Sequence, residues 1–345
     1  MRTPIVKINH NKKLNSFYFQ SKAKDFIDTN KPKHDNIKYY KGLGTSTADD
    51  IKEDFAKRIV EINLNNGSDA LMTNIFGKEN SEFRKNWISS YNDRVEFEED
   101  EIKDYEVEKL DLTSFLNNEF ILFSIDDCKR SIPSMIDGLK ESHRKVLYSA
   151  FKRNLSYSSK SIKVAQFAGY VAEHSNYHHG EQNLYETITK LAQRFVGSNN
   201  VPLLFNDGQF GSRLKLGKDA ASGRYIFTKL DMLTRLIFRK EDEDFLPDRV
   251  DDGDIVEKEF YIPIIPMVLV NGVSAGIGTG WSCNVPCYNP EDIITNIKLW
   301  LQGKSFEELI PWYRNLIYNY KNLLRFLVHY YILQSYLLCY KEPYY

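Results

Sequence analysis

The stretch KVAQFAGYVAEHSNYHHGEQNLYETITKLAQRF, residues 163–195, decides the fold of this chain. Its two ends, 163–174 and 181–195, are each expected to form a helix, because apolar residues recur in them at helical spacing. The apolar face of the second helix consists of Leu184, Ile188, Leu191 and Phe195. A short turn, residues 175–180, separates the helices. Two helices joined by such a turn are typical of helix-turn-helix domains that bind DNA.

Charge is distributed unevenly along the 345 residues, although the net charge is only −1. Residues 128–240 hold 19 Lys and Arg against 8 Asp and Glu, a net of +11, and the rest of the chain carries a net of −12. A basic segment within an acidic chain is typical of a surface that binds a polyanion. The alternative is a solvated charged surface without a ligand.

Composition favours a soluble globular protein of two or three domains, since 42% of the residues are hydrophobic and 27% are charged. The four cysteines form no disulfide framework, which favours an intracellular protein. Cys283 and Cys287 are expected to be buried thiols rather than zinc ligands, because no second pair accompanies them. The N-terminus lacks an apolar leader. Polar residues interrupt the apolar run 323–340, so a membrane span is not expected.

The chain is expected to have an α+β fold. Predicted domain limits divide it into 1–65, 66–125, 126–235, 236–312 and 313–345. Strands are expected at 4–8, 15–19 and 37–40, followed by a helix that Ser46 or Thr47 caps. Further helices are expected at 82–88 and 139–147, and strands at 259–270. The acidic run 96–101 is expected to be a solvated linker, and the last stretch holds nine tyrosines.

A second informative stretch is ASGRYIFT, residues 221–228, which places Arg224 directly before Tyr225. A tyrosine that attacks a phosphodiester needs cations to stabilise the charge on phosphorus and a group to withdraw a proton that a free phenol releases only near pH 10. Arg224 supplies one such cation, and the pair His178–His179 lies about 45 residues upstream. The alternatives are that Arg224 and Tyr225 are ordinary packing or surface residues and that the histidines cap or pack a helix.

Glycines mark two further turns. Residues 272–280 contain four glycines, which indicates that the backbone there passes very close to a partner. Their spacing does not match a dinucleotide-binding loop. Gly42 and Gly44 form a turn that lacks the Lys-Ser/Thr of a Walker phosphate loop.

Seven blocks of the sequence, in family order, resemble the DNA breakage–rejoining core of type IIA DNA topoisomerases, in the eukaryotic and large-DNA-virus branch. The blocks are residues 38–46, 130–134, 177–181, 195–200, 208–211, 224–226 and 271–282. The resemblance covers roughly residues 1–313. It implies that 1–65 is the tail of a TOPRIM domain, that 66–125 is a connector, that 126–235 is a winged-helix domain with the catalytic tyrosine and that 236–312 begins a β-rich tower domain.

The resemblance also implies roles for single residues. Tyr225 matches the nucleophile that forms a 5′-phosphotyrosyl bond, and Arg224 and Arg130 match arginines at the scissile phosphate. His179 matches a histidine of the same cluster. Ile277 matches an isoleucine that wedges between base pairs and bends the DNA, although this chain has one extra residue before Gly276. Further residues expected to bind DNA are Arg144, Lys145, Lys163, His178 and Lys218.

Cofactors and partners follow from the same resemblance. The family enzyme uses Mg²⁺ and ATP and acts as a homodimer on double-stranded DNA. Its metal ligands, a glutamate and an Asp-x-Asp pair, are expected upstream of Met1, so no metal ligand is expected in this chain and cleavage by this chain alone is not expected. A cellular protein would be nuclear, and a viral one would act in the host cytoplasm or viral factory. Two functions compete: part of an ATP-dependent type II topoisomerase, or a catalytically inactive DNA-binding fragment.

Overall fold

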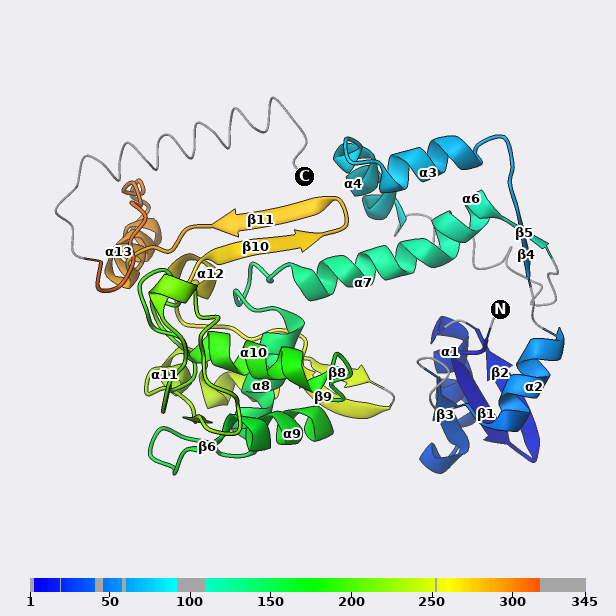
Figure 1. The fold of residues 1–345 in the computed structure, drawn as a ribbon, viewed down its shortest axis with the longest axis horizontal. Coiled ribbons are helices and arrows are strands. Elements are labelled where there is room, and N and C mark those ends of the chain that lie inside the picture. The colour runs from blue at the N-terminus through cyan, green and yellow to red at the C-terminus, as the bar shows by residue number, and fades with distance from the viewer. Residues whose placement is uncertain are drawn as a thin grey trace. The chain divides into compact units, whose positions relative to one another are not determined.

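The computed structural model describes residues 3–18, 20–40, 46–57, 60–91, 109–251 and 253–316. The chain divides into two compact units, an N-terminal unit of residues 1–77 and 86–123 and a C-terminal unit of residues 78–85 and 124–345. Each unit contains both helices and strands, as the α+β prediction requires (Figure 1).

The N-terminal unit begins with a three-stranded antiparallel sheet. Its central strand, β1 (Val6–His10), lies between β2 (Lys13–Phe17) and β3 (Ile37–Tyr39). The turn between β1 and β2 consists of two residues with positive φ, which is the two-residue hairpin geometry that matches strand twist. Alternate residues of β1 are buried against helix α1 (Gln20–Asn30). The three strands predicted here are confirmed, with ends shifted by up to two residues.

The rest of the N-terminal unit is mostly helical. The predicted helix after Thr47 is α2 (Ala48–Lys57), and the Thr47 hydroxyl accepts a hydrogen bond from the amide of Asp50 as expected of a cap. The predicted helix at 82–88 is α4 (Ser81–Ser89). The sequence did not predict several other elements of this unit: β4 (Glu61–Asn63), which pairs in parallel with β5 (Lys109–Asp111), α3 (Ser68–Phe76), α6 (Leu112–Phe115) and the short π-helix η3 (Leu116–Phe120). Nor did it predict α7 (Ile121–Ser131), which begins in this unit and continues from residue 124 in the C-terminal unit. The acidic run 96–101 lies outside the described residues.

Three helices form the centre of the C-terminal unit. They are α8 (Glu141–Lys152), α9 (Val164–His174) and α10 (Glu181–Ala192), and the buried side chains between them form one continuous core. The prediction of two helices joined by a short turn is confirmed for α9 and α10. The predicted end at Phe195 is wrong, because Gln193 adopts an extended backbone and its side chain donates to the carbonyl of Phe210 at 2.9 Å.

The strands predicted at 259–270 are absent from the structure, which describes this whole range. Proline lacks a backbone donor, so Pro263 and Pro266 cannot complete a ladder. The amide of Tyr261 donates instead to the Asp137 carboxylate at 3.1 Å. The carbonyl of Pro266 accepts from two later amides and begins the short helix α12 (Met267–Val270).

The strands of the C-terminal unit form hairpins and a short pair. The hairpins are β8 (Asp248–Asp251) with β9 (Asp254–Lys258) and β10 (Val273–Gly278) with β11 (Trp281–Val285), and the pair is β6 (Ile162–Lys163) with β7 (Phe227–Thr228). The remaining helices are α11 (Thr234–Ile237), α13 (Pro290–Leu301) and the 3₁₀ turns η4 (Arg213–Lys215) and η5 (Lys240–Phe245). In the part of the chain that the structure describes, no helix is both long and apolar enough to cross a membrane.

Candidate active site

In the Tyr225 loop, residues 223–228, hydrogen bonds fix the backbone while the Tyr225 side chain remains exposed. Residues 227–228 pair with β6, and the carbonyls of Ile226 and Gly223 accept hydrogen bonds from the first two amides of α9, Val164 and Ala165, at 3.0 and 2.9 Å. These are the amides that a helix start leaves without an intrahelical partner. Ile226 is buried at 2% exposure, whereas Tyr225 is 67% exposed. The fold therefore presents the phenol to solvent from a rigid base.

The Arg224 guanidinium lies beside this phenol. Its Cζ atom is 5.2 Å from the centre of the Tyr225 ring, which is within the range of a cation–π interaction. Both side chains are exposed. The arrangement places a permanent cation next to the phenol, at a point where a phosphate approaching Tyr225 would meet it.

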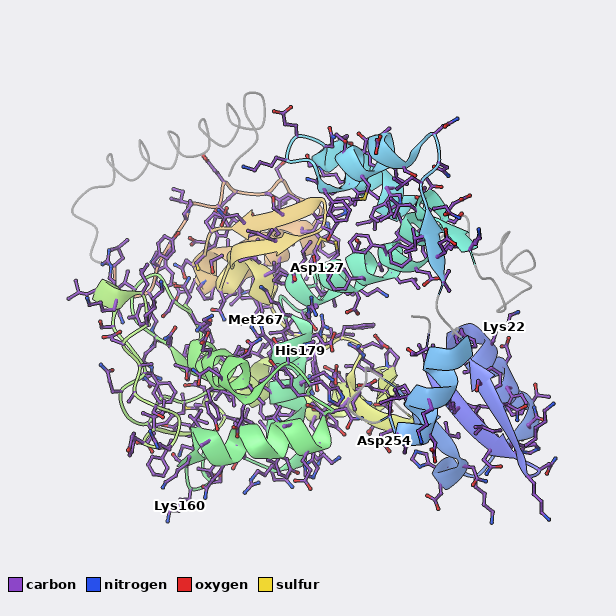
Figure 2. All side chains as sticks on the ribbon, turned by 45° about the vertical axis from the view of Figure 1, so that its right-hand side comes forward. Lys22, Asp127, Lys160, His179, Asp254 and Met267 are labelled. Atoms are coloured by element: carbon purple, nitrogen blue, oxygen red, sulfur yellow. The ribbon has the colours of Figure 1, made fainter. Side chains whose placement is uncertain are left out.

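The His178–His179 turn connects α9 to α10, and Figure 2 labels His179 just before α10 begins. The His179 ring stands edge-on to the ring of Tyr177, with centroids 5.5 Å apart and an interplanar angle of 84°. Tyr177 is itself buried. A hydrogen bond anchors this turn to β8: the side-chain amide of Asn176 donates to the carbonyl of Asp251 at 3.2 Å. His179 is thus an exposed imidazole on a fixed turn.

Arg130 lies in the last turn of α7 and is coupled to the β10–β11 hairpin through Asp127, which Figure 2 labels. Arg130 Nη2 lies 3.3 Å from Asp127 Oδ1, and Asp127 Oδ2 accepts from both the amide and the hydroxyl of Thr279 at 3.1 Å. The Cys128 thiol donates to the carbonyl of Thr279 at 3.2 Å. A guanidinium has five donors, so Arg130 keeps donors for an anion while Asp127 holds it in place.

Ile277 projects from β10 and is 69% exposed. The glycines around it serve close packing against the chain's own α7 rather than an external partner. A Cβ on Gly278 would lie 3.0 Å from Cys128 Cα, and one on Gly276 would lie 3.1 Å from Pro133 Cδ. The pairing of β10 with β11 shifts register between Val273 and Gly276, which accommodates the extra residue. The structure therefore fixes Ile277 and Arg130 on the same assembly of α7 and hairpin.

Two of the residues predicted to bind DNA have another role. Lys145 is 4% exposed, and its Nζ donates to Glu257 Oε2 at 2.8 Å and to the carbonyl of Ser175 at 2.6 Å. Arg144 Nε donates to the buried carboxylate of Asp137 at 2.8 Å. An ammonium or guanidinium committed to a buried carboxylate is not available to phosphate, so we withdraw both from the DNA-binding set. Lys163 and Lys218 are exposed, and they remain predictions.

The Lys145 ion pair extends into a partly buried network that the sequence did not predict. Arg249 of β8 lies 2.8 Å from Glu141 of α8 and 3.6 Å from Glu257 of β9. Burial raises the pKa of Glu257, and the hydrogen bond and charge of Lys145 oppose that shift. Through Ser175, the network also fixes the start of the turn that carries His178 and His179. We therefore regard these residues as scaffold for the candidate site.

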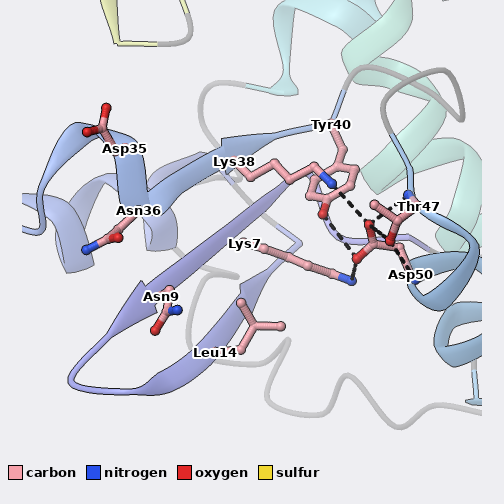
Figure 3. A pocket seen from close by; sticks show the side chains of 9 residues that line it. All are labelled: Lys7, Asn9, Leu14, Asp35, Asn36, Lys38, Tyr40, Thr47 and Asp50. Carbon is pink, nitrogen blue, oxygen red and sulfur yellow. Dashed lines mark hydrogen bonds and ion pairs between the residues drawn. The ribbon is translucent and has the colours of Figure 1, made fainter.

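A separate polar cluster lies in the N-terminal unit, around the carboxylate of Asp50 (Figure 3). Lys7 and Lys38 approach this carboxylate at 2.8 and 3.1 Å, and Tyr40 and Thr47 donate to it as well. The Lys7 bond is the largest of the effects that hold the pKa of Asp50 far below its usual range. The adjoining pocket has a volume of about 330 Å³. Both ammonium groups share this one carboxylate, so the cluster keeps a net charge of +1, and Lys38 is 41% exposed.

A protein metal site needs several ligands that converge on one point. Across the described ranges, no group of three or more His, Cys, Asp or Glu side chains is placed to hold a metal ion. Cys287 is buried, and burial raises its pKa to about 11, but Cys283 and Cys128 are only half-buried. The prediction of buried thiols is thus confirmed for Cys287 and wrong for Cys283.

The structure does not join the predicted catalytic residues to one another. No hydrogen bond, ion pair or ring contact links Tyr225, Arg130 and His179 within the described part of the chain. Tyr225 is held by the start of α9, Arg130 by α7 and the β10–β11 hairpin, and His179 by the turn between α9 and α10. The sequence analysis missed Asp127, because its position three residues before Arg130 becomes a signal only once both are known to lie on one helix, and α7 was not predicted.

Comparisons with known proteins identify the family of the chain. Residues 130–325 match the family model of DNA gyrase/topoisomerase IV, and residues 1–128 match that of the C-terminal associated domain of TOPRIM. A probable DNA topoisomerase 2 of Dictyostelium discoideum is 46% identical over 91% of this chain, and so is the DNA topoisomerase 2-alpha of Rattus norvegicus. The chain spans about a fifth of the length of these relatives.

A solved structure is similar as well. The topoisomerase II DNA-binding, cleavage and re-ligation domain of Plasmodium falciparum matches with a TM-score of 0.77 and 41% sequence identity, over 91% of this chain and 42% of that one. The matched family model covers more than half of the chain, and the fold and the blocks around Tyr225 agree with it. The chain therefore belongs to the type IIA DNA topoisomerase family.

Proposed function

We propose that this chain is the DNA-binding and cleavage segment of a type II DNA topoisomerase and that Tyr225 is its nucleophile. The observation that carries the proposal is the Tyr225 loop itself, where a 67% exposed phenol stands on a backbone fixed at both sides, with the Arg224 guanidinium 5.2 Å from its ring. Such preorganisation is what transfer of a phosphodiester to a side chain requires.

In this reaction the phenolic oxygen of Tyr225 bonds to phosphorus, and the bond from phosphorus to the 3′ oxygen breaks. The phenolic proton passes to a base, and the leaving 3′ oxygen takes up a proton. The reverse transfer reseals the strand. Arg224 and Arg130 stabilise the non-bridging oxygens, and His179 hydrogen-bonds the phosphate or moves a proton. Arg224 contacts the Tyr225 ring, whereas Arg130 and His179 contact neither of these two residues, so a bound phosphate is what the four groups would share.

The wider setting rests on the family resemblance. We propose that the active enzyme is a homodimer that acts on double-stranded DNA with ATP and Mg²⁺ and that Ile277 bends the DNA by wedging between base pairs. For a cellular protein we propose the nucleus, and for a viral one the host cytoplasm or viral factory.

Binding is tested on the chain itself. A labelled duplex titrated at rising KCl should show weak sequence preference and an affinity that falls steeply with salt, because phosphate contacts dominate. An affinity that is flat between low and moderate salt would contradict a DNA-binding role.

Cleavage is tested in a chimaera in which this chain replaces the matching segment of the Dictyostelium relative. Detergent quenching should trap a covalent protein–DNA complex, and Tyr225→Phe should abolish it. Tyr157→Phe is the matched control, since Tyr157 is another exposed tyrosine of the same unit, and it should leave the complex intact. A chimaera that folds and binds DNA but forms no complex would instead favour a DNA-binding segment without catalysis.

A further inference from the structure

Residues 211–219, which we call the basic loop, display two leucines and three cations shortly before the Arg224–Tyr225 pair. Leu214 is 93% exposed and Leu216 is 77% exposed. The cations are Arg213, Lys215 and Lys218, all exposed. Single exposed leucines are ordinary on protein surfaces, but two of them within a cationic loop of nine residues form a distinct surface.

The base of the basic loop is held shut. A Cβ on Gly211 would lie 2.6 Å from Gly217 Cα, so the two backbone segments approach as closely as only glycine permits. The buried amide of Gln193 donates to the carbonyl of Gly217 at 3.4 Å. Ser212 donates through its amide and its hydroxyl to Asp219, at 2.8 and 2.7 Å. The exposed tip is therefore presented on a closed and preorganised base.

Leu216 adopts a conformation that folding alone does not explain. Its backbone is left-handed, with φ 51° and ψ 37°, which costs of order 1 kcal/mol for a residue with a Cβ. Its side chain recovers none of this cost by burial, because it remains largely exposed. A strained backbone that holds an apolar side chain in water suggests a surface that is completed by a ligand.

Charge selects the ligand. Asp219 is the sole acid of the basic loop, and Ser212 already donates twice to it. Among the described residues, none of the loop's three cations forms an ion pair. A second copy of the same loop would repel it, whereas duplex DNA offers phosphates for the cations and sugars and base edges for the leucines.

We propose that the basic loop is a second DNA contact, in which Arg213 and Lys215 bind phosphates flanking the one that Tyr225 attacks and Leu214 and Leu216 pack into the adjacent groove. This inference rests on the proposed function. The loop is tied to the Tyr225 segment by the Ala221 amide, which donates to the carbonyl of Gln209 at 2.9 Å. A rigid contact at that place positions the scissile phosphate along the duplex.

The test measures the affinity of the full chain for a labelled 30-base-pair duplex by fluorescence anisotropy across a KCl series. Replacing two phosphate contacts, in Arg213→Gln with Lys215→Gln, should reduce the slope of log affinity against log salt by about 1.8. Leu214→Ala with Leu216→Ala should raise Kd roughly tenfold with the slope unchanged, because the lost contacts are apolar. The matched controls are Leu301→Ala and Lys304→Gln, exposed residues of the same unit, which should bind as the unmodified chain does.

The outcomes separate this inference from the proposed function. Loop variants that bind DNA like the unmodified chain, while that chain binds with a steep salt slope, overturn the inference and leave the proposed function standing. Unchanged DNA affinity with reduced self-association in sedimentation overturns it in favour of a second copy. An unmodified chain that does not bind DNA overturns both. Thermal unfolding confirms that the variants are folded, which is expected because the substituted side chains are exposed.

Discussion

Replacing Lys145 by Met should destabilise the C-terminal unit strongly and leave the phosphate contacts of its exposed cations intact. The Lys145 ammonium is 4% exposed and lies 2.8 Å from Glu257, which is 1% exposed. Removing one partner of a buried pair leaves an uncompensated charge and typically costs about 3–5 kcal/mol. The carbonyl of Ser175 also loses its donor. Arg249 remains 3.6 Å from Glu257, so we expect a loss of about 3–4 kcal/mol in the free energy of unfolding.

This loss should depend on pH. Burial raises the pKa of Glu257 above its ordinary value, and Lys145 opposes that shift. Without Lys145 the folded-state pKa rises further, so the folded state of the variant binds a proton more tightly than the unfolded chain does. Its stability therefore falls as pH rises through the folded pKa, and the penalty should be larger at pH 8 than at pH 5.

Hydrogen exchange of the α8 amides is the suitable measurement, because global melting would mix the two units. Lys152→Met is the matched control, since it removes an exposed lysine from the same helix and should change stability by less than about 0.5 kcal/mol. The double variant Lys145→Met with Glu257→Leu should recover most of the loss, because no unpaired charge remains. A loss below about 1 kcal/mol for Lys145→Met, or a salt slope of DNA binding reduced by about 0.9, would refute the assignment of Lys145 to the scaffold.

Three further predictions concern other parts of the C-terminal unit. Asn200→Ala should cost about 2–4 kcal/mol by hydrogen exchange, because the buried Asn200 amide donates to three carbonyls and accepts from one backbone amide. Gly211→Ala should make the basic loop sensitive to protease, because the new Cβ would lie 2.6 Å from Gly217 Cα. Its control is Gly169→Ala, where the new Cβ meets no atom within 4 Å, and which should stabilise the unit by about 0.5–1 kcal/mol because alanine favours a helix over glycine. Ile277→Ala should reduce DNA bending, measured by energy transfer in a doubly labelled duplex, while the midpoint of thermal unfolding stays within a few degrees. A large drop in that midpoint with unchanged bending would mean that Ile277 is a packing residue.

Local patterns predicted the elements whose evidence lies within a few residues. The 3.6-residue spacing of apolar side chains predicted α9 and α10, and the alternation in β1 predicted the first sheet, because each pattern records which face is buried. The strand prediction for residues 259–270 was wrong because this run is apolar throughout. Its spacing therefore does not distinguish a strand from a buried irregular segment. The hydrogen bond from Tyr261 to Asp137, 124 residues away, decides that conformation.

The same limit applies to the candidate site. The Arg-Tyr pair is local, and the structure does present it on a fixed and exposed loop. Lys145 reads as part of a basic run, yet its partner Glu257 lies 112 residues further along the chain. No spacing rule connects residues that meet only after the hairpin β8–β9 packs on α8.

Ion pairs reduce the number of cations in the +11 segment that are available to DNA. The structure describes this segment, residues 128–240, throughout. Of its 19 cations, seven lie in ion pairs with acids of the same protein: Arg130, Arg144, Lys145, Lys190, Arg194, Arg235 and Arg239. The cations near Tyr225, in the basic loop and at Arg224, belong to the other group. Since each phosphate contact contributes about 0.9 to the salt slope, its upper limit is set by the unpaired cations together with Arg130, which keeps free donors, rather than by the net charge. A count of charges from the sequence therefore overstates the DNA-binding surface, because folding commits part of that charge to the scaffold that holds the tyrosine in place.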